Sequence, residues 1–505
     1  MPDLIHLPEP RLLFGYNQSL EDPRDGLTLL GPHDPAQNYG VKYGVVATKE
    51  GSRRLRSWIS QLQGPISEVG KERSRPPYPG FEAAFGMPWS VNPALELSFG
   101  EEELRKVVML NDRHKRNFET VRFFTDLILQ AIRNEEVKPE VWIIVIPNFV
   151  RQFCRPESVV MKSDRIEATG RMSMSAARKA VDSPFLFEQL NKDAEAYQYE
   201  PDFHNQLKGR LLAAGVVTQI IQEGTIAHHE FLKPNGRPLQ NLDSLQSQIA
   251  WNISSAMYYK LGARPWKLDG VREGVCYLGL VFKQDTKHIA PETACCAAQM
   301  FLDSGDGVVF KGNIGPWYAP KTGEFHLSAA AARTLLEQAL ESYRSKHSGR
   351  NPKEVFIHGK VRYSAEEWRG FLDATPSETN LVGVRIHEAK RFRLYRVGSK
   401  MPVLRGLAWV QSPRSAILMT RGYIPRLETY PGMEVPLPLE MEICRGEASI
   451  EQVLKDVMGL TKLNYNSCRH SDGWPVTLKF ADAVGEVLIS GPAISNAPLA
   501  FKHYI

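Results

Sequence analysis

The sequence lacks the short motifs that assign many enzymes directly. It contains no P-loop, no Gly-x-Gly-x-x-Gly, no Gly-x-Ser-x-Gly and no His-Glu-x-x-His, so nothing local indicates those nucleotide-binding, hydrolase or metalloprotease sites. Cysteine is scarce, with six in 505 residues and no Cys-x-x-Cys, which argues against a disulfide framework and a zinc ribbon. We expect reduced, mostly buried thiols, with Cys295 and Cys296 in an alanine-rich stretch that favours a helix.

Long apolar runs are also absent. The longest, such as 141–146 and 329–332, fall far short of the roughly 18 to 20 residues that a membrane helix needs. The N-terminal segment MPDLIHLPEPRLLF has no basic region, apolar stretch and small-residue cleavage site in succession, which argues against secretion. We therefore expect a cytoplasmic protein without a membrane span.

Charge of one sign is not in large excess. The 62 Lys and Arg residues against 57 Asp and Glu give a net charge of +5, which alone does not identify a nucleic-acid binder. The distribution is more informative, because Lys390, Arg391, Arg393 and Arg396 alternate with apolar and aromatic residues, as a half-exposed strand would present them. Such a strand suits a channel lined by phosphate groups, and a solvated strand face is an equally good interpretation.

The first half of the chain shows an alternation of strands and helices. Residues 1–37 are rich in proline and glycine, so we expect an extended N-terminal arm there. Beyond it, VWIIVI at 141–146 is a continuous apolar strand suited to a parallel sheet covered on both faces, and 201–215 is a helix with proline at its start and glycine at its end. The pattern predicts a doubly wound, Rossmann-like α/β domain over 38–265.

The second half has a different order of elements. It begins with the strand GVCYLGLVF and two antiparallel strands, and continues with a helix at 327–343, a strand EVFIHG, a helix at 365–372 and further strands. A mixed sheet with a helix after its early strands is the order of an RNase H-like fold, although other α/β arrangements share this periodicity. We predict this second domain over 266–505.

Polar side chains within the first domain suggest an anion pocket. His204 and Lys208 are four residues apart on the predicted helix and so share one face. Gln219 interrupts the apolar strand VVTQII, and Lys260 ends the helix that follows. Amide, ammonium and imidazole donors that converge in an α/β domain would suit a phosphate, whereas each residue alone is more simply a solvated side chain.

The second domain lacks the carboxylates of a two-metal nuclease. Such a site needs several acids at the sheet ends to hold cations about 3.5 to 4 Å apart. Here the strand GVCYLGLVFK has no acid at its centre, and the strand FIHG continues into Lys360, which could not ligate Mg²⁺.

At this level the sequence resembles the MID and PIWI domains of a prokaryotic Argonaute, specifically the short Argonautes without N and PAZ domains. The resemblance covers nearly the whole chain. The supporting segments are LLFGYNQ, PRDGLTLLGP, KYGVVATKEG, PDFHNQLKGRLLAAGVVTQII, NISSAMYYKLGARPW, YLGLVF, EVFIHGKVRYSAEEW, RGYIPRLETYPGMEVPLPLEM, LTKLNYNS and PVTLKFADAV. The resemblance implies that 38–265 is the MID domain and that 266–505 is the PIWI domain.

The same resemblance implies roles for individual residues. A guide 5′-phosphate would be held by His204, Lys208, Gln219 and Lys260, with His204 in place of the tyrosine more usual in long Argonautes. The C-terminal carboxylate of Ile505, together with Gln219, would help hold Mg²⁺ beside that phosphate.

The catalytic acids of the PIWI domain depart from the family pattern. Val281 stands where the first aspartate belongs, Lys360 stands where the third belongs, and Asp482 matches the fourth. Without both bridging carboxylates, we expect no cutting by this domain.

The resemblance further implies a non-slicing sensor. A guide RNA would fill the MID pocket and pair with target single-stranded DNA. A heterodimeric partner carrying an APAZ domain and a TIR or sirtuin-type effector would then hydrolyse NAD, in defence against plasmids or phages, with higher assembly on activation.

Two alternatives stay open. One is a guide-directed nuclease with unusual metal ligands such as Asp303, Asp306 and Asp482. The other is an interaction module whose MID pocket is vestigial and binds no guide.

Overall fold

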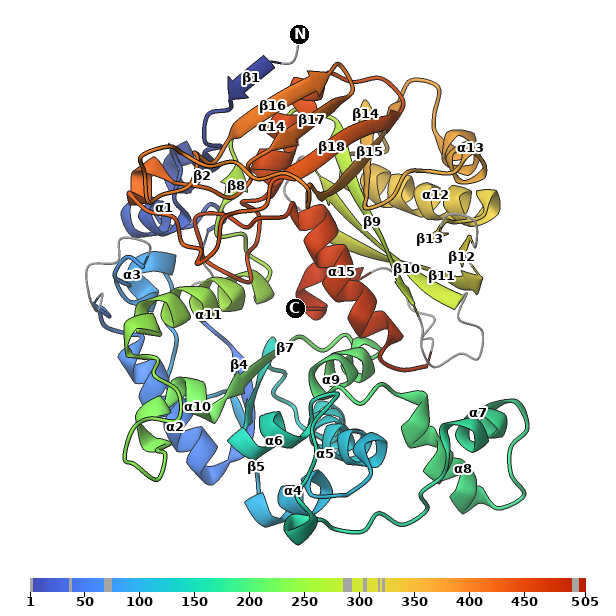
Figure 1. The fold of residues 1–505 in the computed structure, drawn as a ribbon. Coiled ribbons are helices and arrows are strands. Elements are labelled where there is room, and N and C mark those ends of the chain that lie inside the picture. The colour runs from blue at the N-terminus through green and yellow to red at the C-terminus, as the bar shows by residue number, and fades with distance from the viewer. Residues whose placement is uncertain are drawn as a thin grey trace.

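The computed structural model describes residues 3–35, 39–67, 75–284, 293–302, 307–316, 318–319, 323–492 and 499–505. For 293–302 and 307–316 the description covers the backbone. Two sheets dominate the fold, one in each half of the chain (Figure 1).

The smaller sheet has the strand order β5-β4-β6-β7, and all its neighbours are parallel. Its strands are β4 (Tyr43–Thr48), β5 (Leu95–Phe99), β6 (Val141–Ile146) and β7 (Thr218–Gln222). Every residue of β6 is buried, as its uninterrupted apolar sequence predicts. The doubly wound α/β arrangement expected for this part of the chain is therefore present.

Helices cover both faces of the smaller sheet because its side chains alternate between two cores. Val45 and Ile143 pack with one group of helices, α2 (Lys49–Gln61), α3 (Phe81–Phe85) and α11 (Gln246–Lys260). Val46 and Ile144 pack with the other group, α4 (Glu101–Val108), α5 (Arg113–Asn134), α6 (Asn148–Phe153) and α9 (Phe203–Leu212). The short helix α10 (Glu223–Ile226) follows β7 directly.

The larger sheet is mixed and has the order β1-β16-β17-β18-β15-β14-β9-β10-β11-β19. Among the described pairs of neighbouring strands in this sheet, only β9–β14 and β14–β15 are parallel. Its strands are β1 (Asp3–His6), β9 (Val275–Gln284), β10 (Thr293–Leu302), β11 (Gly307–Pro316), β14 (Glu354–Gly359), β15 (Asn380–Glu388), β16 (Leu407–Ser412), β17 (Ser415–Leu418), β18 (Leu439–Arg445) and β19 (Leu499–Ala500). A two-stranded sheet, β12 (Tyr318–Ala319) and β13 (Glu324–Phe325), lies between β11 and the next helix in the chain.

Two pairs of helices lie on opposite faces of the larger sheet. Leu278 and Leu280 point into a core shared with α12 (Ala329–Lys346) and α13 (Ala365–Ala374). Tyr277 and Val281 point into the core shared with α14 (Ile450–Leu460) and α15 (Val476–Ile489). This is the mixed, RNase H-like arrangement expected from the order of strands and helices.

Helix α15 comes very close to β9 because residue 279 is glycine. A Cβ atom at Gly279 would lie 2.0 Å from the carbonyl oxygen of Thr477, in the first turn of α15. In Figure 1 this helix runs through the middle of the molecule, between the two sheets. Helix α15 carries Asp482.

The N-terminal segment is more regular than the extended arm that its proline and glycine content predicts. Strand β1 pairs with β16 at the edge of the larger sheet. Strands β2 (Leu12–Leu13) and β3 (Ser19–Leu20) form a small sheet with β8 (Lys267–Leu268), and α1 (Pro23–Leu30) follows. Asp22 caps α1 by accepting from the amide of Arg24, and Pro23 occupies the first helical position. The segment is thus built into the body of the protein.

Two predictions of secondary structure are wrong. The stretch around Cys295 and Cys296 is the strand β10, because pairing with β9 and β11 overrides the helix propensity of its alanines. Residues 390–396 form no strand and lie in the irregular connection between β15 and β16. In addition, the polar stretch before residue 200 contains α7 (Met174–Asp182) and α8 (Glu188–Glu195), which project from the body in Figure 1.

The cysteines whose side chains the structure describes are free, and most of them are buried, as the sequence predicts. Cys154 and Cys468 are buried and form no disulfide. Among the described residues, no helix is long and apolar enough to cross a membrane.

Candidate nucleic-acid interface

Two lysines from different helices meet at one carbonyl oxygen in the first domain. Lys208 of α9 donates to the carbonyl oxygen of Thr218 over 2.8 Å, and Lys260 at the end of α11 donates to the same oxygen over 3.0 Å. Lys260 also donates to Oε1 of Gln219 over 2.5 Å. The structure therefore brings together Lys208, Lys260 and Gln219, which are well separated in the sequence.

This lysine pair is buried, and no Asp or Glu side chain of the described residues neutralises it. The side chains are only 2% and 1% exposed, and no aspartate or glutamate of the described residues forms an ion pair with either. Burial lowers the pKa of Lys208 to about 7, and burial together with the charge of Lys208 lowers the pKa of Lys260 well below its usual range. Such cations are stabilised when an anion enters, so the lysine pair is suited to a phosphate.

His204 lies one turn before Lys208 on α9, at the surface. Its Nδ1 lies 3.2 Å from the side-chain oxygen of Asn205. Desolvation by the surrounding protein, followed by the positive charge of Lys208, lowers the pKa of His204. A largely neutral imidazole at the mouth of the lysine pair can donate one hydrogen bond without adding a full charge.

The last residue of the chain, Ile505, lies beside the lysine pair. Lys208 donates to the main-chain oxygen of Ile505, the last residue. Phe501, in the short 3₁₀ turn that precedes it, stacks on Phe480 of α15 with the ring centroids 4.1 Å apart. The packing of this turn on α15 holds Ile505 beside α9.

The oxygens at this place have the chemistry that Mg²⁺ prefers. Gln219 Oε1 and the main-chain oxygen of Ile505 are hard oxygen donors, and Mg²⁺ usually takes a few protein oxygens together with phosphate and water. Both oxygens are hydrogen-bonded to ammonium groups, so a cation would need the negative charge of a phosphate beside it.

Val281, Lys360 and Asp482, which the sequence resemblance relates to catalytic positions, also come together. Val281, Lys360 and Asp482 line one cavity of about 220 Å³. Lys360 Nζ lies 2.9 Å from Asp482 Oδ1, and Lys283 Nζ lies 3.2 Å from the same oxygen. Two ammonium groups therefore face the carboxylate of Asp482, and Glu324 and Glu367 line the same cavity. Asp303 and Asp306, the other acids considered as metal ligands, lie outside the described residues. In the part of the chain that is described, no three His, Cys, Asp or Glu side chains gather as a metal site.

The basic segment at 390–396 is at the surface. Lys390, Arg391, Arg393 and Arg396 are all exposed. Phe392 anchors the segment by stacking on Trp409 of β16, with the ring centroids 5.4 Å apart. The charges are thus available for binding, although they lie on a loop and not on the expected strand.

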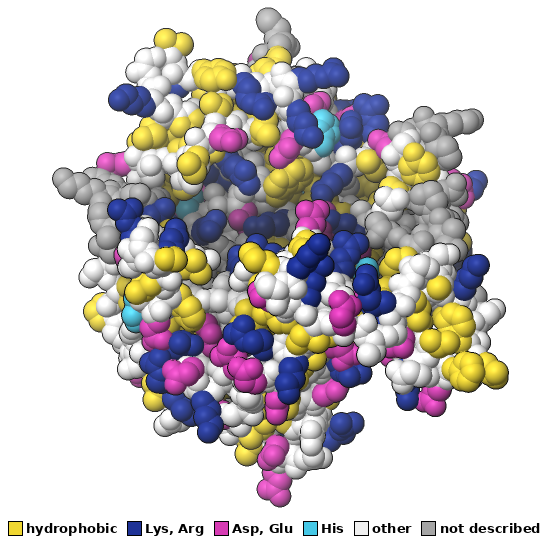
Figure 2. Space-filling view, turned by 60° about the horizontal axis from the view of Figure 1, so that its bottom comes forward, with side chains coloured by type: hydrophobic (Ala, Val, Ile, Leu, Met, Phe, Trp, Pro, Cys, Tyr) yellow, Lys and Arg dark blue, Asp and Glu magenta, His cyan; other side chains and the backbone are white. Residues whose placement is uncertain are grey.

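Sequence reasoning missed a second basic region, a pocket of about 340 Å³ between the N-terminal segment and the loops after β17 and α14. Five arginines line it: Arg24, Arg75, Arg405, Arg421 and Arg469. They are scattered over the sequence, so no local motif could indicate the pocket. Lys and Arg side chains also gather around a hollow on the face drawn in Figure 2.

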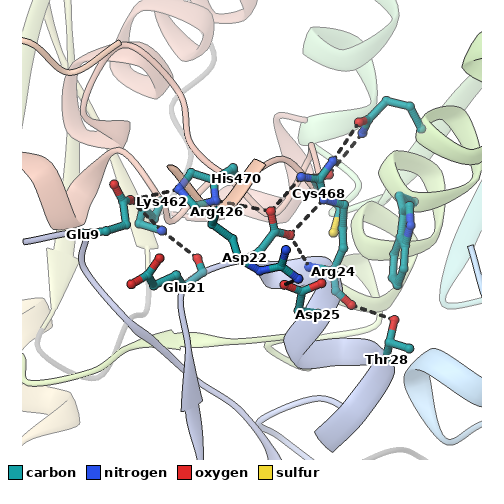
Figure 3. Close-up of polar contacts among 12 residues, drawn as sticks. Glu9, Glu21, Asp22, Arg24, Asp25, Thr28, Arg426, Lys462, Cys468 and His470 are labelled. Atoms are coloured by element: carbon teal, nitrogen blue, oxygen red, sulfur yellow. Dashed lines mark hydrogen bonds and ion pairs between the residues drawn. The ribbon is translucent and has the colours of Figure 1, made fainter. Parts of the chain in front are cut away.

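Two carboxylates, the buried Asp22 and the partly buried Glu9, neutralise one side of this basic pocket (Figure 3). Glu9 pairs with Arg405 over 2.9 Å. It also pairs with Lys462 over 2.7 Å, and Asp22 pairs with Arg24 over 2.7 Å, as Figure 3 shows. The imidazole of His470 lies between them, 3.3 Å from Glu9 and 3.2 Å from Asp22. The N-terminal segment is therefore tied to the second half of the chain through buried charges.

Solved structures of Argonaute and Piwi proteins share this fold over essentially the whole chain. Clostridium butyricum Argonaute, bound to a guide DNA with 5′ deoxycytidine and a 19-mer target DNA, matches with a TM-score of 0.65 and 15% identity, over 100% of this chain and 55% of that one. Drosophila Piwi matches with a TM-score of 0.58 and 13% identity, over 99% and 56% of the two chains. Aa-Ago with externally bound siRNA matches with a TM-score of 0.53 and 13% identity, again over 99% and 56%.

No protein-family model and no curated protein matches the sequence. The chain spans about half the length of the solved proteins that it resembles in structure. From the arrangement of its two sheets and from these matches, the chain has the α/β fold of the MID and PIWI domains of Argonaute proteins.

Proposed function

We propose that this chain is a guide-loaded sensor of complementary nucleic acid that does not cut its target. In this proposal a guide RNA is held by its 5′-phosphate in the first domain, and single-stranded target DNA pairs with it. The choice of RNA as guide and DNA as target rests on the sequence resemblance to short prokaryotic Argonautes.

The buried lysine pair is the observation that carries the proposal. Lys208 and Lys260 keep ammonium groups within 3.0 Å of one carbonyl oxygen and have no aspartate or glutamate partner among the described residues. A terminal phosphate carries close to two negative charges and would supply counter-charge to both ammonium groups. In this proposal Gln219 and His204 would donate further hydrogen bonds to it.

The proposal includes a Mg²⁺ ion beside the 5′-phosphate of the guide. Gln219 and the main-chain oxygen of Ile505 would hold it, and its charge would neutralise phosphate oxygens of the guide. The lysine ammonium groups would then turn from these oxygens toward the phosphate.

The lack of cutting is supported by the cavity at Val281, Lys360 and Asp482. Metal ions in a two-metal site need carboxylates at adjacent positions, and here the apolar side chain of Val281 and the ammonium group of Lys360 stand beside Asp482. A cation brought to Asp482 would be repelled by Lys360 and Lys283.

The effector step is supported by the sequence resemblance. In this proposal an APAZ-domain partner of TIR or sirtuin type forms a heterodimer with the chain and hydrolyses NAD once a target is bound. Depletion of NAD in cells carrying plasmids or phages would be the defence outcome.

Sequencing the nucleic acid that copurifies with the protein tests this function. We expect short RNAs with a 5′-phosphate, and we expect that a complementary single-stranded DNA then raises NAD hydrolysis by the complex with its partner. If no short 5′-phosphorylated nucleic acid copurifies with the protein, guide loading is contradicted. That result would favour the alternative in which the MID pocket is vestigial.

A further inference from the structure

The turn at the end of the chain carries an imidazole that the proposed phosphate site does not use. Residues Phe501–His503 form this 3₁₀ turn. Residues three apart in such a turn share one side, and Phe501 and Tyr504 are both buried in the core. His503 and Ile505 are only partly buried. The packing of the two aromatic rings therefore fixes the position of His503.

His503 contacts the free edge of strand β7. This strand is the last in the smaller sheet, and the carbonyl oxygen of Val217 accepts from the amide of Trp142 on β6, its one neighbour in the described sheet. Successive carbonyl groups of an extended chain point in opposite directions, so those of Val216 and Thr218 point to the free edge. His503 hydrogen-bonds to the backbone of Val216, and the two buried lysines donate to Thr218. The imidazole and the lysine pair therefore lie along the same strand edge.

One ring nitrogen of His503 has no partner. Its Nδ1 atom is buried and makes no hydrogen bond with the part of the chain that is described, so the bond to Val216 belongs to Nε2. Burial, followed by the positive charge of Lys502, lowers the pKa of His503, and the imidazole is therefore neutral at pH 7. A neutral ring that donates from Nε2 carries its free lone pair on Nδ1.

This arrangement of the ring is typical of a metal-binding histidine. A metal-ligating imidazole binds through one nitrogen and donates the other N–H to a backbone carbonyl or a carboxylate, which fixes its tautomer and orientation. Phosphate oxygens need hydrogen-bond donors, which a lone pair does not supply. The Nδ1 atom of His503 is therefore suited to a cation and not to the phosphate itself.

Oxygen ligands lie close to this nitrogen. The main-chain oxygen of Ile505, two residues further along the chain, accepts from Lys208, and the charge of Lys208 also acts on His503. The Oε1 atom of Gln219 accepts from Lys260 on the same strand edge. A cation at this place would thus have two oxygens and one nitrogen of the protein within its surroundings.

We propose that Nδ1 of His503 is a third protein ligand of the divalent cation beside the guide 5′-phosphate, and that this nitrogen makes the site favour Mn²⁺ over Mg²⁺. Mg²⁺ takes oxygen ligands, whereas first-row transition-metal ions also accept imidazole nitrogen. The inference rests on the proposed function, because the guide phosphate supplies the remaining negative charge at the site.

The test measures the concentration of Mg²⁺ or Mn²⁺ that gives half-maximal capture of a labelled short RNA with a 5′-phosphate, starting from EDTA. The protein is the chain coexpressed with its partner. His503→Asn keeps an oxygen ligand near the position of Nδ1, and His503→Phe keeps a ring without a ligand. The matched control is His229→Asn, at an exposed histidine beyond the carboxyl end of β7.

The wild type should need at least about tenfold less Mn²⁺ than Mg²⁺, because weakening a metal-ligating histidine typically costs 10- to 100-fold in metal affinity. His503→Asn and His503→Phe should each raise the required Mn²⁺ concentration by about tenfold or more and change the required Mg²⁺ concentration little. His229→Asn should behave as the wild type. Pulsed EPR of the bound Mn²⁺ should show coupling to a directly bound nitrogen nucleus in the wild type and none in His503→Asn.

An unchanged Mn²⁺ requirement in both His503 variants would overturn the proposal, as would equal changes in His503→Asn and His229→Asn. Capture that needs no divalent cation would do the same. Thermal unfolding checks each variant, and the nitrogen coupling of the wild type decides the matter should both His503 variants fold poorly.

The same titrations with a 5′-hydroxyl RNA separate this inference from the proposed function. Equal affinity of the wild type for both RNAs with either metal would contradict guide binding through the 5′-phosphate. A clear preference for the 5′-phosphate, with no response of metal binding to the His503 variants, would contradict only the role of His503.

Discussion

Lys208 and Lys260 donate to the same carbonyl oxygen, that of Thr218, from two helices on opposite faces of the smaller sheet. Neither helix alone would make an anion site. Their meeting depends on β7, whose first residue presents its carbonyl oxygen to both ammonium groups. The doubly wound architecture is thus what turns two isolated lysines into one buried positive site.

Removal of the Asp22 carboxylate should destabilise the protein strongly. Asp22→Asn removes the carboxylate that pairs with the buried Arg24 and leaves His470 with Glu9 alone, and breaking a buried pair typically costs about 3 to 5 kcal/mol. The matched control is Asp25→Asn on the same helix, whose partner Arg426 is exposed, and its cost should stay below about 1 kcal/mol. Denaturant unfolding of both variants measures the difference, and similar costs would contradict the importance of the buried pair.

The same carboxylate predicts an acid limit to stability. Burial raises the pKa of Asp22, but the charge of Arg24 and its hydrogen bond lower it by more, so the pKa lies well below its usual range. The contribution of Asp22 to stability is therefore complete above its unfolded pKa of about 3.9 and is lost as the pH falls through the lower folded value. The free energy of unfolding of the wild type, measured by denaturant unfolding, should exceed that of Asp22→Asn at neutral pH. This difference should disappear only below about pH 4.

The exposed basic loop should contribute to the salt dependence of target binding. Each phosphate contact by Lys or Arg contributes a slope of about −0.7 to −0.9 in log affinity against log salt. Arg391→Gln with Arg393→Gln should therefore flatten the slope by up to about two units. Capture of a short 5′-phosphorylated guide end should stay nearly intact. An unchanged slope in the double variant would show that this loop is solvated and does not contact phosphates of the target.

The protein should not cut its target. Asp482 faces two ammonium groups, and Val281 offers no ligand. Guide-loaded protein incubated with Mg²⁺ or Mn²⁺ and a matched, end-labelled DNA should return the DNA at full length. Cleavage at one internal phosphate would show a nuclease with unusual ligands.

The isolated chain should associate with itself unless a partner is present. Leu186 and Phe187, before and at the start of the projecting helix α8, are 93% and 68% exposed. Replacing both with serine should lower the aggregated fraction seen by size-exclusion chromatography, and coexpression with the partner should do the same. A monodisperse, guide-competent wild-type chain made alone would contradict an obligate heterodimer.

The parts of the fold that could be predicted are those with a strong local pattern. The apolar run of β6 and the amphipathic repeat of α5 specify their own structure, because burial follows directly from the sequence. Residues 390–396 show the alternation of a strand but have no pairing partner, and alternation without a partner makes no strand. Cys295 and Cys296 show the opposite case, in which two pairing strands impose β structure on alanines.

The candidate site was predictable in part. His204 and Lys208 stand four residues apart on one helix, Gln219 interrupts an apolar strand and Lys260 ends a helix, and the sequence indicates each of them in this way. Their common contact at Thr218 depends on tertiary structure, so no spacing in the sequence shows it. The five arginines of the basic pocket and the buried acids behind them come from distant segments, and only the folded chain brings them together.

The affinity for two guides that differ only at the 5′ end tests the central claim most directly. Wild-type protein and the double variant Lys208→Ala with Lys260→Ala are titrated with the same labelled RNA, carrying either a 5′-phosphate or a 5′-hydroxyl. Because each charge-assisted contact contributes roughly 1.5 to 3 kcal/mol, the wild type should prefer the phosphate by at least about tenfold, and the double variant should lose that preference. Equal affinity of the wild type for both RNAs, or equal loss for both in the variant, would contradict a 5′-phosphate site at the lysine pair.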